Sequence, residues 1–157
     1  MGQMMQSSRM QPLQQIADIR ESDAARRFVE AQRLQADREA RLIELSRYRE
    51  EYSRECARSG DGAGDGPADA ATPQLLRNRQ AFIDRLREAE RFQQQLVEQA
   101  VRGVDECRAH WLLQQRGART VAQLTACYLA REQREDARRE QNRLDEFAMQ
   151  RYLRAAD

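Results

Sequence analysis

The sequence has few of the residues on which catalytic sites and compact cores depend. It has no Lys, one His, three Pro and only 6% aromatic residues in a chain of 157. Without Lys there is no Walker A motif, whose Lys reaches the phosphates of a bound nucleotide. Any catalytic dyad or triad that needs an imidazole depends on His110 alone. We therefore predict a protein that is not an enzyme and has no catalytic residues, cofactor or small-molecule substrate.

Cysteine is also scarce. Cys56, Cys107 and Cys127 are widely spaced and odd in number, which indicates free thiols in a reducing compartment rather than a disulfide framework. Cys107 and His110 share one helical face, but a structural zinc site needs four ligands and no other Cys or His lies near them in sequence. We predict no metal site.

Long apolar runs are absent as well. No stretch approaches the roughly 18 apolar residues that cross a bilayer. The first fifteen residues lack the apolar core of a secretory signal. We predict a soluble, cytoplasmic protein.

What the chain does contain is charge and good helix formers. Charged residues make up 34% of the chain, and its 27 basic residues are all Arg, balanced by 26 acids. The mixture is typical of long helices or coiled coil. Acid-first pairs at i, i+4, which stabilise exposed helices, recur in Asp37/Arg41, Glu50/Arg54, Glu98/Arg102 and Glu135/Arg139. The balanced charge disfavours nucleic-acid binding. We attribute the Arg-only usage to nucleotide bias in the gene, with guanidinium-specific recognition of phosphate or carboxylate as the alternative.

A single Gly-rich segment divides the chain. Residues 59–73 read SGDGAGDGPADAATP, through which a helix is not expected to continue. The sequence predicts a helix over 12–58, a turn over 59–72 and a longer helix over 73–155. Thr72 is the expected N-cap of the second helix and Pro73 its first residue. The predicted fold is an all-α antiparallel two-helix coiled-coil hairpin forming one domain over 1–157.

Apolar residues recur at helical spacing in both predicted helices. Eleven-residue steps from Ala31 to Leu42 and from Leu34 to Leu45 predict a partly hendecad seam in the first helix. If the helices pair across the turn, the numbers of facing residues add up to about 132 to 134. Pairing then ends near Val121, unless the N-terminal arm extends the first helix. The predicted seam is Phe28, Ala31, Leu34, Leu42, Leu45, Tyr52 and Cys56 against Phe82, Leu86, Ala89, Leu96, Ala100, Val104, Cys107, Trp111, Val121, Leu124 and Tyr128.

One stretch of this seam has a surplus of large side chains near the turn. The register places Tyr52 opposite Phe82, Tyr48 opposite Leu86 and Leu45 opposite Ala89, followed by Arg41 opposite Gln93. Much of this stretch is expected to be ordinary seam. One partner helix does not cover the whole set, however, and a partly exposed apolar-aromatic strip is typical of protein-binding sites.

These residues carry a family resemblance. The pattern Leu45-x-x-Tyr48-Arg49-x-Glu51-Tyr52, a Gly-rich break and Asn78-x-x-x-Phe82-x-x-x-Leu86 resembles the flagellar export protein FliJ. Arg108-x-x-Trp111 and the segment 139–146 agree with it. The resemblance covers almost the whole chain. The nearest relatives of that family are the stalk proteins of nonflagellar type III secretion.

The resemblance implies a stalk-like coiled coil of the flagellar type III export apparatus, needed for flagellum assembly and so for motility and chemotaxis. Its implied partners are the hexameric export ATPase FliI, the export gate FlhA and export chaperones that it escorts. It implies a cytoplasmic protein, peripheral at the inner membrane, that regulates the ATPase and is a monomer when free. The implied gate-binding residues are Leu45, Tyr48, Tyr52, Phe82, Leu86, Ala89, Gln93 and Arg41. The implied ATPase-binding residues are Arg131, Arg138, Arg139, Glu140, Gln141, Asp145 and Glu146.

This sequence departs from the family at two of these positions. Arg41 stands where Gln is common, and Gln93 stands where His is known. The alternative functions are a self-associating structural tether, whose apolar strip closes a dimer, and a nonflagellar secretion stalk.

Overall fold

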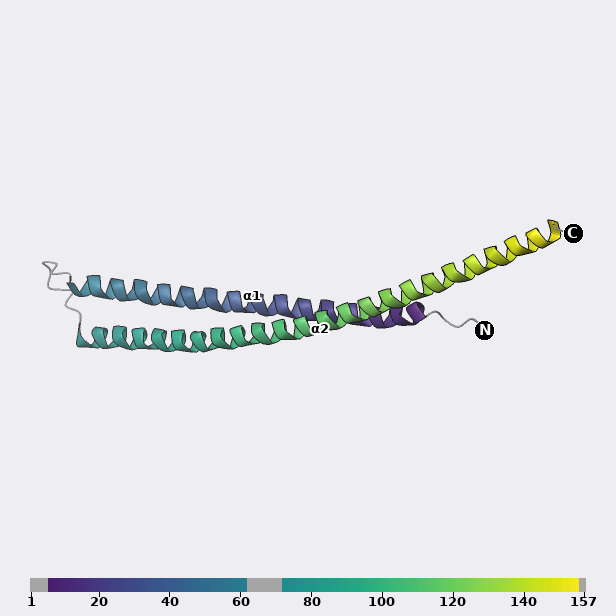
Figure 1. Ribbon diagram of the computed structural model, residues 1–157. Helices are drawn as coiled ribbons and strands as arrows, with labels where there is room; N and C mark the ends of the chain where they lie inside the picture. The colour runs from purple at the N-terminus through teal and green to yellow at the C-terminus, as the bar shows by residue number, and fades with distance from the viewer. Residues whose placement is uncertain (1–5, 62–71, 156–157) are drawn as a thin grey trace. The chain divides into compact units, whose positions relative to one another are not determined.

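The protein consists of two long helices. The computed structural model describes residues 6–61 and 72–155, and every residue in these ranges except Thr72 is helical. Helix α1 spans Gln6–Asp61 and helix α2 spans Pro73–Ala155, with 56 and 83 residues (Figure 1). The predicted all-α fold with a longer second helix is confirmed.

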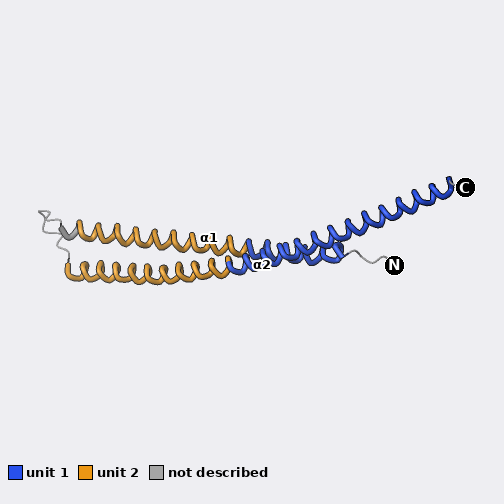
Figure 2. The backbone as a smooth tube through the Cα atoms, viewed as in Figure 1, with its two compact units in different colours: residues 1–25, 109–157 blue, residues 26–108 orange. Residues whose placement is uncertain are grey.

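The chain divides into two compact units, each of which combines a segment of α1 with a segment of α2 (Figure 2). Unit 1 comprises residues 1–25 and 109–157, and unit 2 comprises residues 26–108. The assignment of one domain to residues 1–157 stays a prediction.

The two helix segments of unit 2 run antiparallel. Tyr52 of α1 contacts Phe82 of α2 with ring centroids 4.7 Å apart. Further along, the side chain of Gln93 in α2 donates a hydrogen bond of 2.9 Å to the carbonyl oxygen of Arg38 in α1. Residue numbers therefore fall along one helix as they rise along the other. The pair Tyr52 and Phe82 has the predicted register.

Unit 1 has the same antiparallel arrangement, and in it α1 is longer than predicted. Trp111 Nε1 donates to Glu21 Oε1 at 3.0 Å, and the backbone N–H of Ser7 donates to Glu132 Oε1 at 3.0 Å. The Ser7 hydroxyl donates to the same carboxylate. Pairing therefore reaches Glu132 and does not end near Val121, because the N-terminal arm extends the first helix, which was the predicted alternative.

The predicted helix bounds need two further corrections. Helix α1 begins at Gln6 instead of about Pro12, which lies inside the helix. It also ends at Asp61 rather than 58, so the first residues of the predicted turn 59–72 are helical; residues 62–71 of that turn lie outside the described residues.

The start of α2 is as predicted. Pro73 is its first residue, where a missing N–H costs nothing. Thr72 Oγ1 accepts a hydrogen bond of 3.4 Å from the N–H of Leu75, and the Thr72 carbonyl accepts one of 3.1 Å from Leu76. The first bond satisfies an N–H of the first turn that has no backbone partner, and the second is the first i→i−4 bond of the helix.

The seam of α1 follows a seven-residue repeat and not the predicted hendecad. In unit 2 its buried and half-buried positions alternate in steps of three and four from Phe28 to Cys56. Leu34 lies off this stripe and is 49% exposed, while Gln35 and Arg38 occupy seam positions. Leu124 of unit 1 is 46% exposed and is also not a seam residue. The other residues of the predicted seam are buried or half-buried.

The core is one side chain thick. Among the described residues, five are buried: Ala24, Leu86, Gln93, Val97 and Ala100. Leu86, Gln93 and Ala100 follow one another at seven-residue steps, so α2 has the same repeat as α1. A seam this narrow leaves both flanks of each helix pair exposed. In the described ranges, neither helix has a stretch long and apolar enough to cross a membrane.

Candidate partner-binding site

Three aromatic side chains meet in unit 2. The Phe82 ring contacts Tyr52 at 4.7 Å between centroids, with an interplanar angle of 66°, and Tyr48 at 6.4 Å and 85°. Both are edge-to-face arrangements, which the ring quadrupoles favour. Tyr52 sits on the seam and Tyr48 precedes it by one turn on the flank, so a single α2 ring contacts both.

The predicted gate-binding residues near the turn differ in their solvent exposure: some form a surface, and others lie beneath it. Tyr48 is 50% exposed, and Leu45, Tyr52, Phe82 and Ala89 are half-buried. These five residues form what we call the aromatic strip. Leu86 is 9% exposed and lies beneath it, so it holds the two helices together.

Gln93 and Arg41, where the sequence departs from the resembled pattern, differ in solvent exposure. Gln93 is 7% exposed, and its amide is bonded to the Arg38 carbonyl. It is therefore part of the seam and not of the surface. Arg41 is exposed beside the strip. Its guanidinium is available to a partner, whereas the side chain of Gln93 is not.

An ion pair that the sequence did not single out lies across the seam beside the strip. Arg49 Nε donates to both carboxylate oxygens of Glu90, at 3.0 and 2.9 Å. The two side chains are only 28% and 17% exposed, so the pair is partly desolvated. The seven-residue spacing from Leu42 through Arg49 to Cys56 is the signal that could have revealed Arg49 as a seam residue.

The Tyr52 hydroxyl is partly desolvated. Burial raises the pKa of Tyr52 above 10.0, and the neighbouring thiol of Cys56, through charge interaction and hydrogen bonding, raises it further. The positive charge of Arg79 opposes this effect, and Tyr48 adds to it weakly. The surroundings of the Tyr52 hydroxyl therefore favour the neutral phenol.

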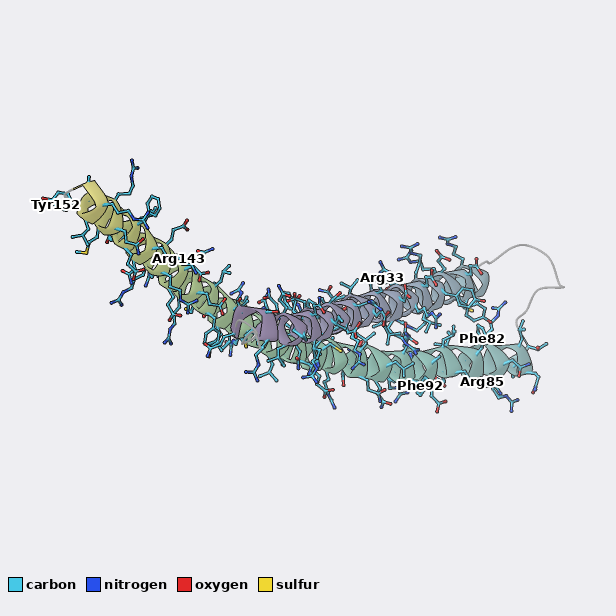
Figure 3. All side chains as sticks on the ribbon, turned by 90° about the vertical axis from the view of Figure 1, so that its right-hand side faces the viewer. Arg33, Phe82, Arg85, Phe92, Arg143 and Tyr152 are labelled. Atoms are coloured by element: carbon cyan, nitrogen blue, oxygen red, sulfur yellow. The ribbon has the colours of Figure 1, made fainter. Side chains whose placement is uncertain are left out.

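Phe92 is a further exposed aromatic residue that the sequence did not single out. It is 62% exposed. Figure 3 shows Phe92 and Arg85 on the side of α2 that faces away from α1, whereas Phe82 points toward α1. No spacing signal distinguishes Phe92, because it lies off the seam stripe.

The predicted ATPase-binding residues lie in the C-terminal part of α2, within unit 1, and all are exposed. Two ion pairs run along the helix, Arg131 with Glu135 at 3.0 Å and Arg139 with Asp136 at 3.6 Å. The Gln141 amide also donates a hydrogen bond of 3.0 Å to Asp145 Oδ1. Apolar side chains also project from this segment, each more than half exposed: Leu144, Phe147, Met149, Tyr152 and Leu153.

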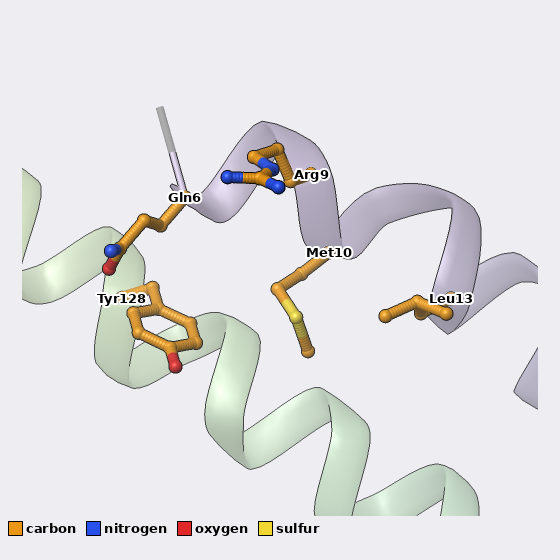
Figure 4. Close-up of a pocket in the computed structure, with 5 residues that line it drawn as sticks. All are labelled: Gln6, Arg9, Met10, Leu13 and Tyr128. Carbon is orange, nitrogen blue, oxygen red and sulfur yellow. The ribbon is translucent and has the colours of Figure 1, made fainter. Parts of the chain in front are cut away.

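A small cavity lies at the start of α1 in unit 1. Its volume is about 330 Å³, and Tyr128 of α2 faces α1 across it (Figure 4). The N–H groups of the first α1 turn are bound nearby by Glu132, and these hydrogen bonds lower the pKa of that carboxyl. The sequence prediction missed this cavity because it began the helix at Pro12. The lining residues are Gln6, Arg9, Met10, Leu13 and Tyr128.

In the described ranges no three His, Cys, Asp or Glu side chains converge as they would to hold a metal ion. Cys56 and Cys107 are half-buried free thiols, and Cys127 is an exposed one. His110 is exposed.

Comparison with known protein families gives a match over nearly the whole chain. The family model described as "Flagellar FliJ protein" matches residues 5–157, nearly the whole chain. No curated protein and no solved structure matches.

Proposed function

Since the chain belongs to the FliJ family of flagellar proteins, with a role in flagellar protein export, we propose that it is a stalk-like adaptor between the export ATPase FliI and the export gate FlhA. In this proposal it also escorts empty export chaperones and regulates the ATPase. It performs no chemical step itself. It works in the cytoplasm and at the cytoplasmic face of the inner membrane, and flagellum assembly, motility and chemotaxis depend on it.

The observation that carries the proposal is the aromatic strip. Large aromatic residues dominate the energetics of protein interfaces because they bury much area with few rotatable bonds. Tyr48 stands half exposed, and its neighbours Tyr52 and Phe82 are ordered by ring contacts within unit 2. Such a surface needs little reordering on binding, which favours a fixed docking site for the gate.

The C-terminal segment of α2 supports the ATPase contact. Its charged residues are exposed and largely balanced by neighbours one turn away. Such a surface does not adhere strongly to any one subunit of a ring. The exposed side chains of Phe147 and Tyr152, at 62% and 76%, supply the apolar contacts that an otherwise unpartnered helix needs.

The proposal is tested by separating the two contacts. The double variant Tyr48→Ala/Phe82→Ala should lose affinity for the cytoplasmic domain of the gate and abolish motility, while ATPase stimulation persists. A truncation after Ala130 should show the opposite pattern. Ile43→Ala is the matched control, because Ile43 is 59% exposed and lies off the seam stripe. If the double variant binds the gate normally and loses ATPase stimulation, the two assignments are reversed.

A self-associating tether is the alternative to be tested alongside. A stalk that enters a ring should exist as a monomer of 18.3 kDa, whereas a tether should form tight dimers at low micromolar concentration. Light scattering coupled to size exclusion distinguishes the two masses. Dimers that persist through dilution and are lost in Tyr48→Ala would favour the tether.

A further inference from the structure

Arg79 has an unsatisfied polar group inside unit 2. It lies in the first turns of α2 and is half-buried. Its Nη1 atom is shielded from solvent, and no side chain or carbonyl among the described residues accepts a hydrogen bond from it. A buried guanidinium N–H without an acceptor has lost its hydrogen bond to water without forming one in the protein, which destabilises the folded state.

The groups around Arg79 belong to the aromatic strip. Its positive charge acts on the Tyr52 hydroxyl, which is itself partly desolvated and lies beside the thiol of Cys56. The Tyr52 ring packs against Phe82, three residues after Arg79. The Tyr52 phenol, on which the Arg79 charge acts, is neutral when protonated and so does not balance that charge.

Glu90 lies eleven residues beyond Arg79 along α2, about 16 Å away, and both of its carboxylate oxygens are bonded to Arg49 Nε. It therefore does not supply the missing acceptor. The planar guanidinium of Arg79 offers five N–H donors in a fork that matches a carboxylate, and it keeps its charge at any physiological pH. This long side chain has many rotamers, so its fork can turn from the seam toward the surface.

We propose that Arg79 binds a carboxylate side chain of the protein that docks on the aromatic strip, so that the recognised segment carries an Asp or Glu beside an apolar residue. The apolar residue packs on Tyr48 and Phe82, and the acid pairs with the guanidinium. This inference rests on the proposed function of the strip. It adds the chemical class of the partner's contact and assigns Arg79 to recognition rather than to stability.

Binding is measured by calorimetry with the purified cytoplasmic domain of the gate protein. Arg79→Gln should weaken binding by about tenfold or more, since charge-assisted bonds are about twice as strong as neutral ones. Arg79→Lys should recover only part of this loss, because Lys has no fork. Arg85→Gln is the matched control: it removes the same charge from an exposed site that faces away from α1 (Figure 3), and should change affinity by less than about twofold.

A stability measurement separates recognition from folding. Arg79→Met should leave the melting temperature of the chain unchanged or raise it, because the buried donor without an acceptor disappears, while gate binding weakens as in Arg79→Gln. If Arg79→Met lowers the melting temperature substantially, or if Arg79→Gln binds like wild type, the inference is wrong.

Charge reversal identifies the acid. Arg79→Glu should abolish binding, and Arg in place of one acidic residue of the gate domain should restore it; if no such exchange restores binding, the pairing is wrong. If Tyr48→Ala weakens binding and the Arg79 variants do not, only this inference fails. If the wild-type chain does not bind the gate domain at all, the proposed gate contact fails together with it.

Discussion

Gln93 and Arg38 are joined across the seam of unit 2 by a hydrogen bond from the Gln93 amide to the Arg38 backbone carbonyl, 2.9 Å long. Gln93 is 7% exposed, so the bond is shielded from water. A buried polar group at a seam position fixes the register of two helices, because any slip leaves it unpaired, and it does so at a cost in stability. The position of the aromatic strip depends on this register.

The first prediction concerns this bond. Gln93→Leu should raise the free energy of unfolding by about 1 kcal/mol or leave it unchanged, since an apolar residue of similar volume replaces a buried amide. The Arg38 carbonyl keeps its helical partner in the variant. Register should become less specific, which crosslinking between Cys residues introduced at 52 and 82 would detect as a loss of yield. A variant that is destabilised by several kcal/mol would show that the hydrogen bond itself holds the helices together.

The ion pair of Arg49 and Glu90 should contribute a measurable coupling energy to stability. Their side chains are less than a third exposed and form two hydrogen bonds, so the interaction exceeds that of an ordinary surface pair. A double-mutant cycle with Arg49→Ala and Glu90→Ala should give a coupling energy of about 1–2 kcal/mol in urea unfolding. The exposed pair of Arg54 and Glu50, at 3.4 Å, is the control and should couple by less than about 0.5 kcal/mol. Equal coupling energies in the two cycles would contradict the partial desolvation of the first.

Glu132 should make the first turn of α1 sensitive to acid. Hydrogen bonds from Ser7 and Gln6 lower the pKa of Glu132 below its ordinary value of 4.5. A carboxyl whose pKa is lowered in the folded state stabilises it above the unfolded pKa, and the contribution disappears as pH falls through the folded value. The Ser7 amide should therefore lose protection from hydrogen exchange below about pH 4.5 in wild type. In Glu132→Gln, which offers a weaker acceptor, protection should already be low at pH 7.

The Tyr52 hydroxyl should lose its proton at a higher pH than an ordinary tyrosine does. Burial raises its pKa above 10.0, so the folded state holds the phenol proton more tightly than the unfolded state does. For a raised pKa the stabilising contribution is complete below the unfolded value and is lost as pH rises through the folded one. The absorbance difference between wild type and Tyr52→Phe should therefore have a midpoint above pH 10.0. A midpoint below this value would mean that Tyr52 is solvated, and that Arg79 dominates its surroundings.

The sequence predicted the helices, the antiparallel pairing and the contact of Tyr52 with Phe82, because these follow from spacing and from one Gly-rich segment. It did not predict the contact of Tyr48 with Phe82. It misplaced parts of the seam, since it ranked residues by hydrophobicity. Leu34 is exposed while the polar Gln35 and Arg38 hold seam positions. The Gln35 amide donates to Glu39 within α1, whereas the Arg38 backbone carbonyl accepts from Gln93 of α2. Pairings of that kind appear only when both helices are in place.

The start of α1 was mispredicted for a related reason. Pro is common at the first position of a helix, so the sequence predicted that the helix begins at Pro12. In the protein α1 continues to Gln6. Its first N–H groups are satisfied by Glu132, which is 125 residues away from Ser7 along the chain. A cap supplied by a distant helix has no local sequence signal.

The contrast between Leu86 and Leu34 gives the last prediction, which tests the observed seam against the predicted one. Leu86 is 9% exposed between the helices and Leu34 is 49% exposed. Leu86→Ala should lower the free energy of unfolding by about 2–3 kcal/mol, because it removes buried methyl groups and leaves a cavity. Leu34→Ala should change it by less than about 0.5 kcal/mol, since Ala is also the better helix former. Thermal unfolding followed by circular dichroism at 222 nm measures both. If Leu34→Ala were as destabilising as Leu86→Ala, Leu34 would be a seam residue and the hendecad originally predicted for α1 would hold.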